Sequence, residues 1–318
     1  MAVCRVESVC GHATELLELK PYSMPRLHIV FVPGNPGIVG FYKDYLAALS
    51  KHFEGAASIT AIGHIAHTAH DYEKGKKFSL QQQIDHKAGF LEERYINSDL
   101  PTVLVGHSIG AYIILELLKR FPNKLQCVIG LHPFLKTNPD SLKQAVLKAI
   151  CESSLMRATV SSLAGLLGHS PAWISRRLVK AVVGRAWGPC AVDTTCKYLL
   201  RFLTRTSELH GCQLHVHGDD RVCKGLLFLI MQLKEEVDWD FLRENHRRVC
   251  FLFGIDDHWG PLSLLEQVHE RVPGLKTAVV QSEDITHDFC CTKPGSEWVA
   301  RFTAERIKEV FGDDSIQK

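Results

Sequence analysis

The stretch from residue 101 to residue 120 constrains the fold of this chain more than any other. A short apolar run ends at residues 106–110, whose sequence is Gly-His-Ser-Ile-Gly, and a segment with helical spacing follows. Such a run predicts a buried parallel strand. A Gly-x-Ser-x-Gly motif between a strand and a helix is typical of a nucleophile elbow, the tight turn that presents a reactive serine. The alternative is an ordinary strand-to-helix turn whose serine caps the helix.

Strand and helix patterns alternate along most of the chain. Besides the elbow strand, apolar strand-like runs occupy residues 27–32, 57–62, 126–131, 248–253 and 277–281, and residues 3–20 resemble two strands around a turn. Helical spacing marks residues 41–52, 79–94 and 297–311. This alternation predicts an α/β fold, a mostly parallel sheet with helices on both faces.

The alternation stops between about residues 140 and 243, where helix and turn signals replace strand signals. We therefore expect a helical cap inserted between the sixth and seventh strands of the sheet. The chain then divides into a first core part (1–139), a helical cap (140–243) and a second core part (244–318).

The composition excludes several classes of protein. The chain has 318 residues, of which 46% are hydrophobic and 23% charged, and its net charge is +2. A globular domain with a real core is expected, and nothing in the charge indicates a nucleic-acid partner. No apolar run is long enough to span a membrane, and the first residues do not resemble a signal peptide. Eleven scattered cysteines without a Cys-x-x-Cys pair favour reduced thiols in a cytosolic compartment, and neither a metal nor an organic cofactor is expected.

A serine nucleophile needs a histidine base and a carboxylate that holds the histidine. In an elbow-type hydrolase the chain order is serine, acid, histidine, and ligand sites lie at the carboxyl ends of parallel strands. Ser108, Asp257 and His287 satisfy both conditions, because the latter two follow the last two predicted strands.

Neighbouring residues compete for two of these roles. Asp256 is the alternative acid, but Asp257 alone fits the spacing Gly-x-x-Asp-x-x-x-Pro, with the proline at position 261. His258 adjoins the acid and would have to fold back on it. His107 lies inside the elbow, where a packing role is the simpler interpretation. His287 remains the preferred base.

The oxyanion of a tetrahedral intermediate requires two preorganised N–H donors. Ile109, which follows the nucleophile, is one candidate, and Asn35 in the loop after the strand at 27–32 is the other. Pro36 cannot donate, because it has no N–H. The alternative is that residues 34–37 form only a structural turn.

Three histidines in the loop after the strand at 57–62 raise the question of a metal site. His64, His67 and His70 are spaced by three residues. This spacing places ligands poorly on one helix face, and no carboxylate or cysteine adjoins them, so loop histidines near a pocket are the preferred interpretation.

Several motifs occur together in a characteristic order. These are Pro-Gly-Asn-Pro-Gly at 33–37 with Phe41-Tyr42, Leu80-x-x-Gln83-Ile84-x-His86-Lys87, the elbow at 106–110, Asp257-x-Trp259-x-Pro261 and His287. With this set the chain resembles the lipid droplet-associated hydrolase family of α/β-hydrolases over nearly its whole length. The resemblance implies a serine hydrolase at the lipid-droplet surface, with a further pool at the endoplasmic reticulum or in the cytosol, that acts on sterol esters or other neutral lipids. By motif position it places the nucleophile, acid and base at Ser108, Asp257 and His287.

One local departure from the family pattern concerns the pocket. After the strand at 126–131 the family pattern is Phe-Pro-Thr, whereas this chain has His132-Pro133-Phe134. The change alters the predicted pocket floor and therefore bears on substrate identity, but it leaves the predicted triad unchanged.

The cap carries the basic charge of the molecule. Residues 141–225 contain twelve Lys or Arg and five Asp or Glu. On a helix over 196–205, Lys197, Arg201 and Arg205 would share one face and apolar residues the other, and residues 174–182 repeat this pattern. A basic amphipathic helix is typical of a lipid-surface site. The alternative is a lid helix whose basic face is merely solvated.

Together these predictions describe a serine ester hydrolase that works through an acyl-enzyme on neutral-lipid esters, such as sterol esters or acylglycerols, at a lipid surface. A thioesterase or acyltransferase would use the same triad. A droplet-binding protein with little turnover is the alternative from another functional class.

Overall fold

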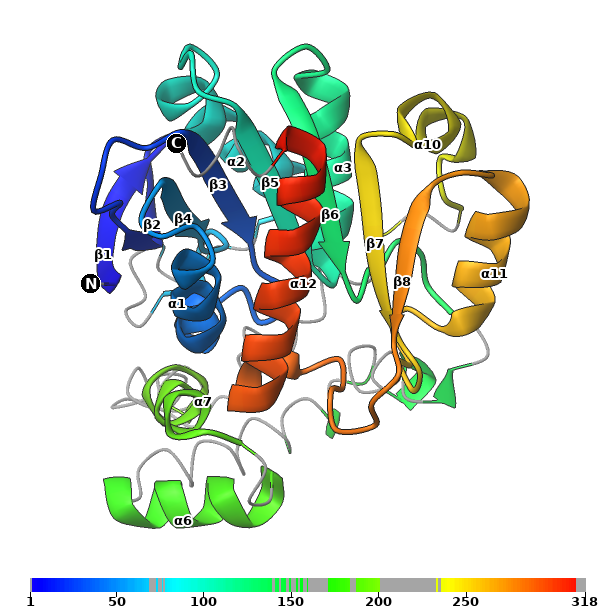
Figure 1. Cartoon of the computed structure of the whole chain (residues 1–318). Helices are drawn as coiled ribbons and strands as arrows, with labels where there is room; N and C mark the ends of the chain where they lie inside the picture. The colour runs from blue at the N-terminus through cyan, green and yellow to red at the C-terminus, as the bar shows by residue number, and fades with distance from the viewer. Residues whose placement is uncertain are drawn as a thin grey trace.

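The computed structural model describes residues 2–68, 78–138, 171–183, 187–200 and 236–312, together with a few residues at 73–76, 141–159 and 233. Eight strands form one sheet in the order β1-β2-β4-β3-β5-β6-β7-β8 (Figure 1). Their bounds are Ala2–Val9 (β1), His12–Leu19 (β2), Leu27–Val32 (β3), Ala57–Ile62 (β4), Thr102–His107 (β5), Leu125–Leu131 (β6), Val249–Gly254 (β7) and Lys276–Val280 (β8). Strands β3 to β8 are parallel, whereas β2 pairs antiparallel with β1 and β4.

Alternating side chains of the central strands build a core on each face of the sheet. Ile29 and Phe31 of β3 pack on one side with helices α1 (Lys43–Lys51) and α12 (Lys293–Phe311). Val30 and Val32 face the opposite side, toward α2 (Leu80–Arg94), α3 (Ile109–Arg120) and α11 (Leu262–Arg271). The remaining described helices outside the cap are η1 (Val39–Tyr42), α10 (Trp239–Asn245) and η4 (Phe289–Cys291). Helices cover both faces, because every central strand is apolar on both.

This architecture is the α/β-hydrolase fold that the alternation of strands and helices predicted. The hairpin of β1 and β2, the elbow strand β5 and the parallel order from β3 to β8 all match the expected elements. Helices α6 (Ala172–Val183) and α7 (Pro189–Thr194) fall between β6 and β7, as expected for the cap. The exact boundaries at 139 and 243 stay predictions.

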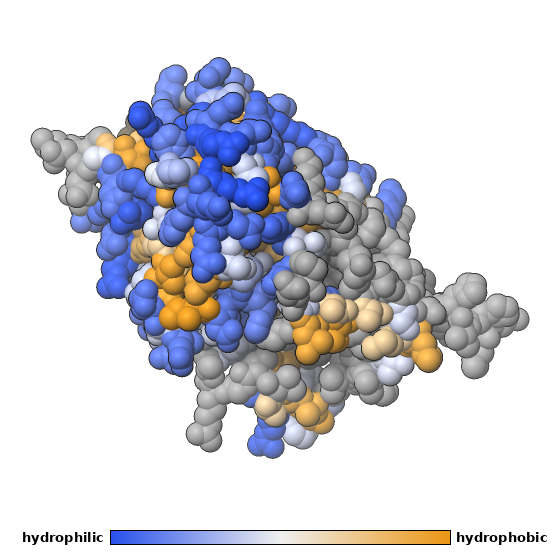
Figure 2. All heavy atoms as spheres, turned by 90° about the vertical axis from the view of Figure 1, so that its right-hand side faces the viewer, coloured by the Kyte–Doolittle hydropathy of each residue, from blue (hydrophilic) through white to orange (hydrophobic). Residues whose placement is uncertain are grey.

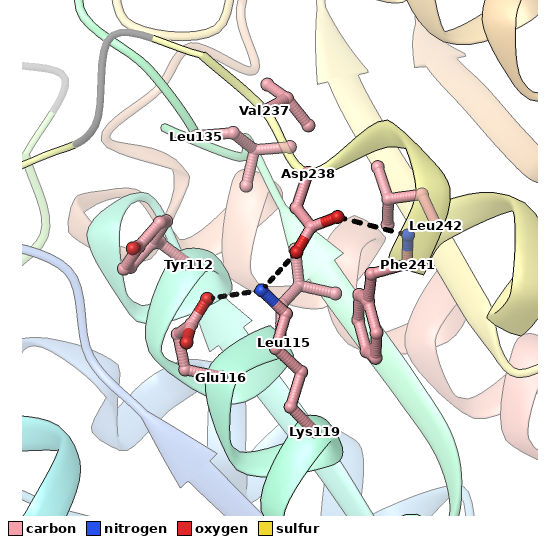
Figure 3. A pocket seen from close by; sticks show the side chains of 9 residues that line it. All are labelled: Tyr112, Leu115, Glu116, Lys119, Leu135, Val237, Asp238, Phe241 and Leu242. Carbon is pink, nitrogen blue, oxygen red and sulfur yellow. Dashed lines mark hydrogen bonds and ion pairs between the residues drawn. The ribbon is translucent and has the colours of Figure 1, made fainter.

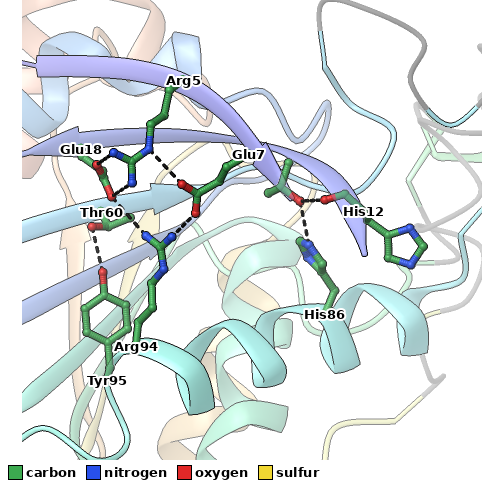
Figure 4. A network of polar contacts seen from close by, with 9 residues as sticks. Arg5, Glu7, His12, Glu18, Thr60, His86, Arg94 and Tyr95 are labelled. Atoms are coloured by element: carbon green, nitrogen blue, oxygen red, sulfur yellow. Dashed lines mark hydrogen bonds and ion pairs between the residues drawn. The ribbon is translucent and has the colours of Figure 1, made fainter. Parts of the chain in front are cut away.

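Helix α2 joins the hairpin to the parallel part of the sheet through polar contacts (Figure 4). Arg94 at its end pairs with Glu7 and Glu18, and Arg5 of β1 pairs with the same two carboxylates. At the start of the helix, the Gln82 N–H donates to the Ser79 hydroxyl oxygen, and the Ser79 N–H donates to the side-chain oxygen of Gln82. This capping box fixes where α2 begins, next to residue 79, where the predicted helical spacing starts.

Helix α6 faces outward with part of its apolar surface. Among the α6 residues whose burial the structure describes, Ser175 and Val179 are buried, whereas Trp173 is 62% exposed and Leu178 is 40% exposed. In Figure 2 most of the coloured surface is hydrophilic, and the hydrophobic side chains form a few patches, some of them toward the lower end of the molecule, where α6 lies in Figure 1.

The next segment differs from the predicted amphipathic α-helix over 196–205. Its described part is η2 (Thr195–Leu200), a π-helical turn, so the spacing of an ordinary α-helix does not apply there. Lys197 is exposed, and its Nζ lies 4.8 Å from the centre of the Tyr198 ring. Arg201 and Arg205 lie outside the described residues. No helix among the residues that the structure describes is long and apolar enough to cross a membrane.

A small hollow between α3 and α10 is lined in part by an ion-paired group of side chains. Lys119 Nζ lies 2.8 Å from a carboxylate oxygen of Glu116 and 2.8 Å from one of Asp238 (Figure 3). The hollow has a volume of about 20 Å³, which is room for roughly one water molecule. It is therefore a packing feature and not a candidate substrate site.

Candidate active site

Ser108 lies at the turn between β5 and α3 in a strained backbone conformation. Its φ is +54°, a value that is uncommon for a residue with a side chain. A Cβ atom on Gly106 would lie 2.3 Å from the Gly110 carbonyl oxygen, and one on Gly110 would lie 2.3 Å from the Val32 carbonyl oxygen. Both positions therefore require glycine, which is the physical reason for the Gly-x-Ser-x-Gly pattern at this turn.

The loop after β3 lies against the serine. A Cβ atom on Gly34 would approach the Ser108 Cβ to 2.8 Å, so the loop backbone passes close to the nucleophile. The far side of this loop is braced by the loop after β4, where the His64 N–H donates to the Gly37 carbonyl over 3.0 Å and His67 Nδ1 bonds the Pro36 carbonyl.

The hydrogen bonds of this loop single out Asn35. The Gly34 N–H donates to the Tyr42 hydroxyl, the Gly37 N–H donates to the Gly34 carbonyl, and Pro36 has no N–H. Among the described residues this leaves the Asn35 N–H as the donor that the loop can offer to a substrate. Ile109 is the first residue of α3, and the first N–H groups of a helix have no partner within it. One predicted oxyanion donor thus follows Ser108 directly in the chain, and the other belongs to the loop that passes beside Ser108.

Asp257 and His287 meet at the carboxyl ends of β7 and β8. His287 Nδ1 lies 2.9 Å from each carboxylate oxygen of Asp257. The backbone N–H groups of Trp259 and Gly260 donate to Asp257 Oδ1 over 2.9 and 3.1 Å. The aspartate is buried and held from behind, so it can fix both the orientation and the tautomer of the imidazole.

Asp256 and His258, the competing candidates, form a separate surface pair. The Asp256 side chain is 87% exposed, and His258 Nε2 lies 3.7 Å from its Oδ1. Neither side chain reaches the buried carboxylate. The geometry therefore favours Asp257 and His287 as the acid and base.

A second imidazole shares the carboxylate of Asp257. His132 follows β6, is fully buried and has a φ of +45°. Its Nδ1 lies 3.2 Å from Asp257 Oδ2, and its ring stacks on Phe289. Because a carboxylate only accepts hydrogen bonds, His132 must carry its proton on Nδ1. The departure from the family pattern at this position therefore places a donor on the candidate triad acid.

Burial and neighbouring groups shift the pKa values of Asp257 and His132. Burial opposes ionisation of Asp257, but the neighbouring His287 and the hydrogen bonds from His132 and His287 outweigh it and hold the pKa of the carboxyl well below its usual value. Burial lowers the pKa of His132, so this imidazole is neutral at neutral pH. The acid is thus ionised under all ordinary conditions.

His107, inside the elbow, is buried and makes two hydrogen bonds. Its Nδ1 lies 2.7 Å from the Tyr42 hydroxyl, and its Nε2 lies 3.0 Å from the His287 carbonyl oxygen. Burial also lowers the pKa of His107 well below its usual value. Both ring nitrogens are therefore engaged, and the ring links two loops of the site.

A metal ion would find ligands in one place among the residues that the structure describes. His132, Asp257 and His287 offer ligand atoms that all lie within 4.8 Å of one another. Their nitrogen–oxygen distances are those of ordinary hydrogen bonds, and the group contains the predicted acid and base. The triad interpretation accounts for these contacts without a metal. Of the three loop histidines, His64 and His67 pack beside residues 36–37, and His70 lies outside the described residues.

Sequence reasoning did not find the roles of Tyr42, His107 and His132 in this site. Each contacts a partner that is 65 to 180 residues away along the chain. The one available signal was that each lies directly after a strand end or within a named motif. Nothing in the spacing indicated their mutual contacts.

Comparisons with protein families and with known proteins both find lipid droplet-associated hydrolases. A family model described as "Lipid-droplet associated hydrolase" matches residues 25–290. A Dictyostelium discoideum protein named lipid droplet-associated hydrolase is 29% identical over 283 residues, which cover 84% of each chain.

Solved structures support the fold at low sequence identity. A thermophilic esterase from Thermogutta terrifontis is similar with a TM-score of 0.60 and 14% identity, over 98% of this chain and 99% of that one. The haloalkane dehalogenase DatA from Agrobacterium tumefaciens C58 is similar with a TM-score of 0.65 and 15% identity, over 97% of both chains. These structures differ in chemistry and therefore speak for the fold alone.

Proposed function

From the premise that this chain belongs to the lipid-droplet associated hydrolase family, we propose that it cleaves carboxylic esters of neutral lipids through an acyl-enzyme on Ser108. Membership of this family makes it a hydrolase. The serine mechanism, the ester substrate and the roles of the triad residues are our proposal.

The contact that carries this proposal is the one between Asp257 and His287. His287 Nδ1 lies 2.9 Å from both carboxylate oxygens, which fixes its proton on Nδ1 and leaves Nε2 free to act as a base. The elbow places Ser108 beside the loop that contains Asn35. A buried acid, an oriented imidazole and a strained serine are the parts that acyl transfer requires.

The reaction then follows from these groups. His287 takes the proton of the Ser108 hydroxyl as its oxygen attacks the ester carbonyl, and the N–H groups of Asn35 and Ile109 stabilise the oxyanion. His287 returns the proton to the leaving alcohol, which leaves the acyl group on Ser108. Water, activated by the same imidazole, releases the acid. Asp257 stays ionised throughout and stabilises the imidazolium.

A sterol ester or an acylglycerol fits this proposal best, because the relatives carry the lipid-droplet name and helix α6 of the cap exposes large apolar side chains. Trp173 and Leu178 of α6 are exposed apolar residues, and Arg177 lies 5.8 Å from the Trp173 ring. Exposed apolar side chains flanked by basic ones are typical of a lipid-surface site. We propose that the cap, with Lys197, Arg201 and Arg205, docks on the droplet surface, with a further pool at the endoplasmic reticulum or in the cytosol.

Labelling with a fluorophosphonate tests the nucleophile. The native protein should react, and Ser108→Ala should lose the label while its circular dichroism and melting temperature stay close to those of the native protein. Ser79→Ala, which removes a hydroxyl from the α2 cap, is the matched control and should keep the label.

The result separates the candidate functions. Labelling that persists in Ser108→Ala would overturn the assignment of the nucleophile. A native protein that resists the probe would favour a droplet-binding protein with little turnover. If labelling succeeds, hydrolysis of a sterol ester, a triacylglycerol and an acyl thioester, each presented in phospholipid-coated droplets, identifies the substrate class.

A further inference from the structure

Tyr42 and His107 form a buried bridge between two loops of the candidate active site. The Gly34 N–H donates to the Tyr42 oxygen over 3.0 Å, and the Tyr42 oxygen lies 2.7 Å from His107 Nδ1. On the other side of the ring, His107 Nε2 lies 3.0 Å from the His287 carbonyl oxygen. The bridge therefore starts beside Asn35, the proposed oxyanion donor, and ends on the proposed base.

The direction of every hydrogen bond in this bridge is fixed. The His287 carbonyl only accepts, so His107 Nε2 carries a proton. If Nδ1 carried one too, it and the Gly34 N–H would both donate to the Tyr42 oxygen, and the buried tyrosine proton would lose its acceptor. The remaining solution is a neutral His107 whose Nδ1 accepts a hydrogen bond from the Tyr42 hydroxyl.

Aromatic packing holds the two bridging residues in place. Tyr42 and His107 are buried, and their ring centres are 5.7 Å apart. The centre of the Phe31 ring lies 4.5 Å from that of Tyr42. The centre of the Phe289 ring lies 5.1 Å from that of His107. Close packing and hydrogen bonds with one possible direction allow these two residues to keep the loops on either side at a fixed distance.

We propose that Tyr42 and His107 are positioning residues that hold the oxyanion loop and the base loop at a fixed separation across the elbow. This inference rests on the proposed serine mechanism and extends it to residues that do not touch the substrate. The bridge joins segments that are 65 and 180 residues apart along the chain, at the carboxyl ends of β3, β5 and β8.

The expected kinetic signature is a loss in kcat with little change in KM. Displacing an oxyanion donor weakens contacts made in the transition state and leaves ground-state binding almost unaltered. Removing such a donor lowers kcat by about 10²–10³, and a donor that is only displaced should matter less. We expect Tyr42→Phe to lower kcat roughly 10–100-fold, with KM changed by less than about twofold.

Tyr45→Phe is the matched control. Tyr45 is also fully buried, belongs to the same aromatic cluster and makes one hydroxyl contact, to Thr303 Oγ1 at 3.1 Å. Its hydroxyl has no link to the oxyanion loop. Tyr42→Phe should lose more stability, because it leaves two buried partners of the hydroxyl without a bond and Tyr45→Phe leaves one. Both variants should still fold, and only Tyr42→Phe should slow the hydrolysis of p-nitrophenyl butyrate and the reaction of Ser108 with the fluorophosphonate.

Substitutions of His107 test the two halves of the bridge separately. In His107→Gln the amide nitrogen can replace Nε2 and donate to the His287 carbonyl. In His107→Asn the amide oxygen can replace Nδ1 and accept from Tyr42. His107→Leu loses both bonds, so its kcat should be the lowest of the three, and either amide should restore part of it.

Nitrogen NMR of the native protein provides a readout that does not depend on activity. His107 should give the signals of a neutral imidazole protonated on Nε2, and the Nδ1 signal should move in Tyr42→Phe but not in Tyr45→Phe.

The outcomes separate this inference from the proposed function. A native protein that resists the fluorophosphonate contradicts the serine mechanism, and the NMR signals still test the bridge. If the native protein is labelled but Tyr42→Phe and Tyr45→Phe have the same kcat, the positioning role is wrong. If Tyr42→Phe does not fold, equal kcat values for the three His107 variants would overturn it instead.

Discussion

The loops that carry the candidate triad bury polar side chains, whereas helix α6 of the cap exposes apolar ones. Asp257 and His107 are buried, and each of their polar side-chain atoms has a hydrogen-bond partner. On α6, Trp173 and Leu178 are exposed while Ser175 is buried. One region places polar groups inside the protein, and the other places apolar groups outside it.

The difference shows what each region is built for. Burying paired polar groups fixes their geometry and strengthens their electrostatic effect, which suits a reaction centre. Exposing large apolar groups is unfavourable in water unless another non-aqueous surface covers them. If chemistry and lipid attachment are divided in this way, changes at the triad should affect catalysis alone and changes in the cap should affect droplet binding alone.

The largest effect is expected at the buried acid. Asp257→Asn should lower the acylation rate by roughly 10³–10⁴, as for other triad acids, because an amide no longer fixes the tautomer of His287. Stopped-flow measurement of Ser108 acylation checks this, and droplet binding should stay unchanged.

Asp256→Asn is the control for that change. Its carboxylate is solvent-exposed and contacts His258 at the surface, so acylation should stay within about twofold of the native rate. A larger loss in Asp256→Asn than in Asp257→Asn would show that the assignment of the acid is wrong.

The next effect is expected in the cap. Changing Lys197, Arg201 and Arg205 together to Glu should lower the affinity for phospholipid-coated droplets by roughly two orders of magnitude or more, since each basic residue at an anionic surface contributes about 1 kcal/mol. Droplet flotation measures this. Fluorophosphonate labelling in solution should persist.

A second triple variant controls for net charge. Arg243, Arg271 and Lys276 lie on α10, α11 and β8, toward the amino ends of the parallel strands. Changing them to Glu gives the same net charge at the opposite edge of the sheet from the candidate site. If both variants float equally poorly, attachment depends on overall charge and not on the cap.

The sequence predicted most of the fold and the main residues of the candidate site, because these depend on local patterns. Apolar runs mark β3, β5 and β7, and the glycines at 106 and 110 mark the elbow. The order of strand ends then placed Asp257 and His287 at one edge of the sheet. Each inference needed only neighbouring residues and the rule that parallel strands end together.

The remaining features depend on contacts that no local pattern contains. The bridge through Tyr42 and His107 requires three loops at their final separation, and the bond of His132 to the acid requires a backbone with φ of +45°. Helix α6 was predictable as a helix, but not the choice of its buried face, since Ser175 and not Leu178 is inside. The π-helical turn at η2 is likewise invisible to an analysis that assumes α-helical spacing.

A smaller effect on catalysis is expected at His132. His132→Phe removes one of the two imidazoles that bond Asp257 and should lower kcat roughly tenfold, the equivalent of about one hydrogen bond to a charged group. His132→Asn, whose amide can replace the Nδ1 donor, should recover part of that loss. Equal losses in the two variants would assign the effect to packing.

The stability difference between the native protein and His132→Phe should depend on pH in a defined direction. The pKa of Asp257 is held below its ordinary value of 3.8, so its ionisation stabilises the native protein above about pH 4, and this stability is lost as the pH falls further. Burial lowers the pKa of His132, so the native protein also loses stability as the pH falls below about 6.5. His132→Phe weakens the stabilisation that comes from the ionised Asp257, and it removes the loss of stability that comes from protonating His132. The difference in melting temperature between native and variant should therefore narrow from pH 7 to pH 3, and a constant difference would contradict the proposed protonation states.

The smallest effect on stability, and the sharpest test of the comparison, concerns α6. Trp173→Ala and Leu178→Ala truncate side chains that are 62% and 40% exposed, so each should change the free energy of unfolding by no more than about 0.5 kcal/mol. Val179→Ala, on the buried face of the same helix, should destabilise more. Urea unfolding measures all three, and flotation should show weaker droplet binding for the first two alone. If Trp173→Ala unfolds the protein as readily as a core substitution, its indole packs within the cap, and the lipid-facing role of α6 is wrong.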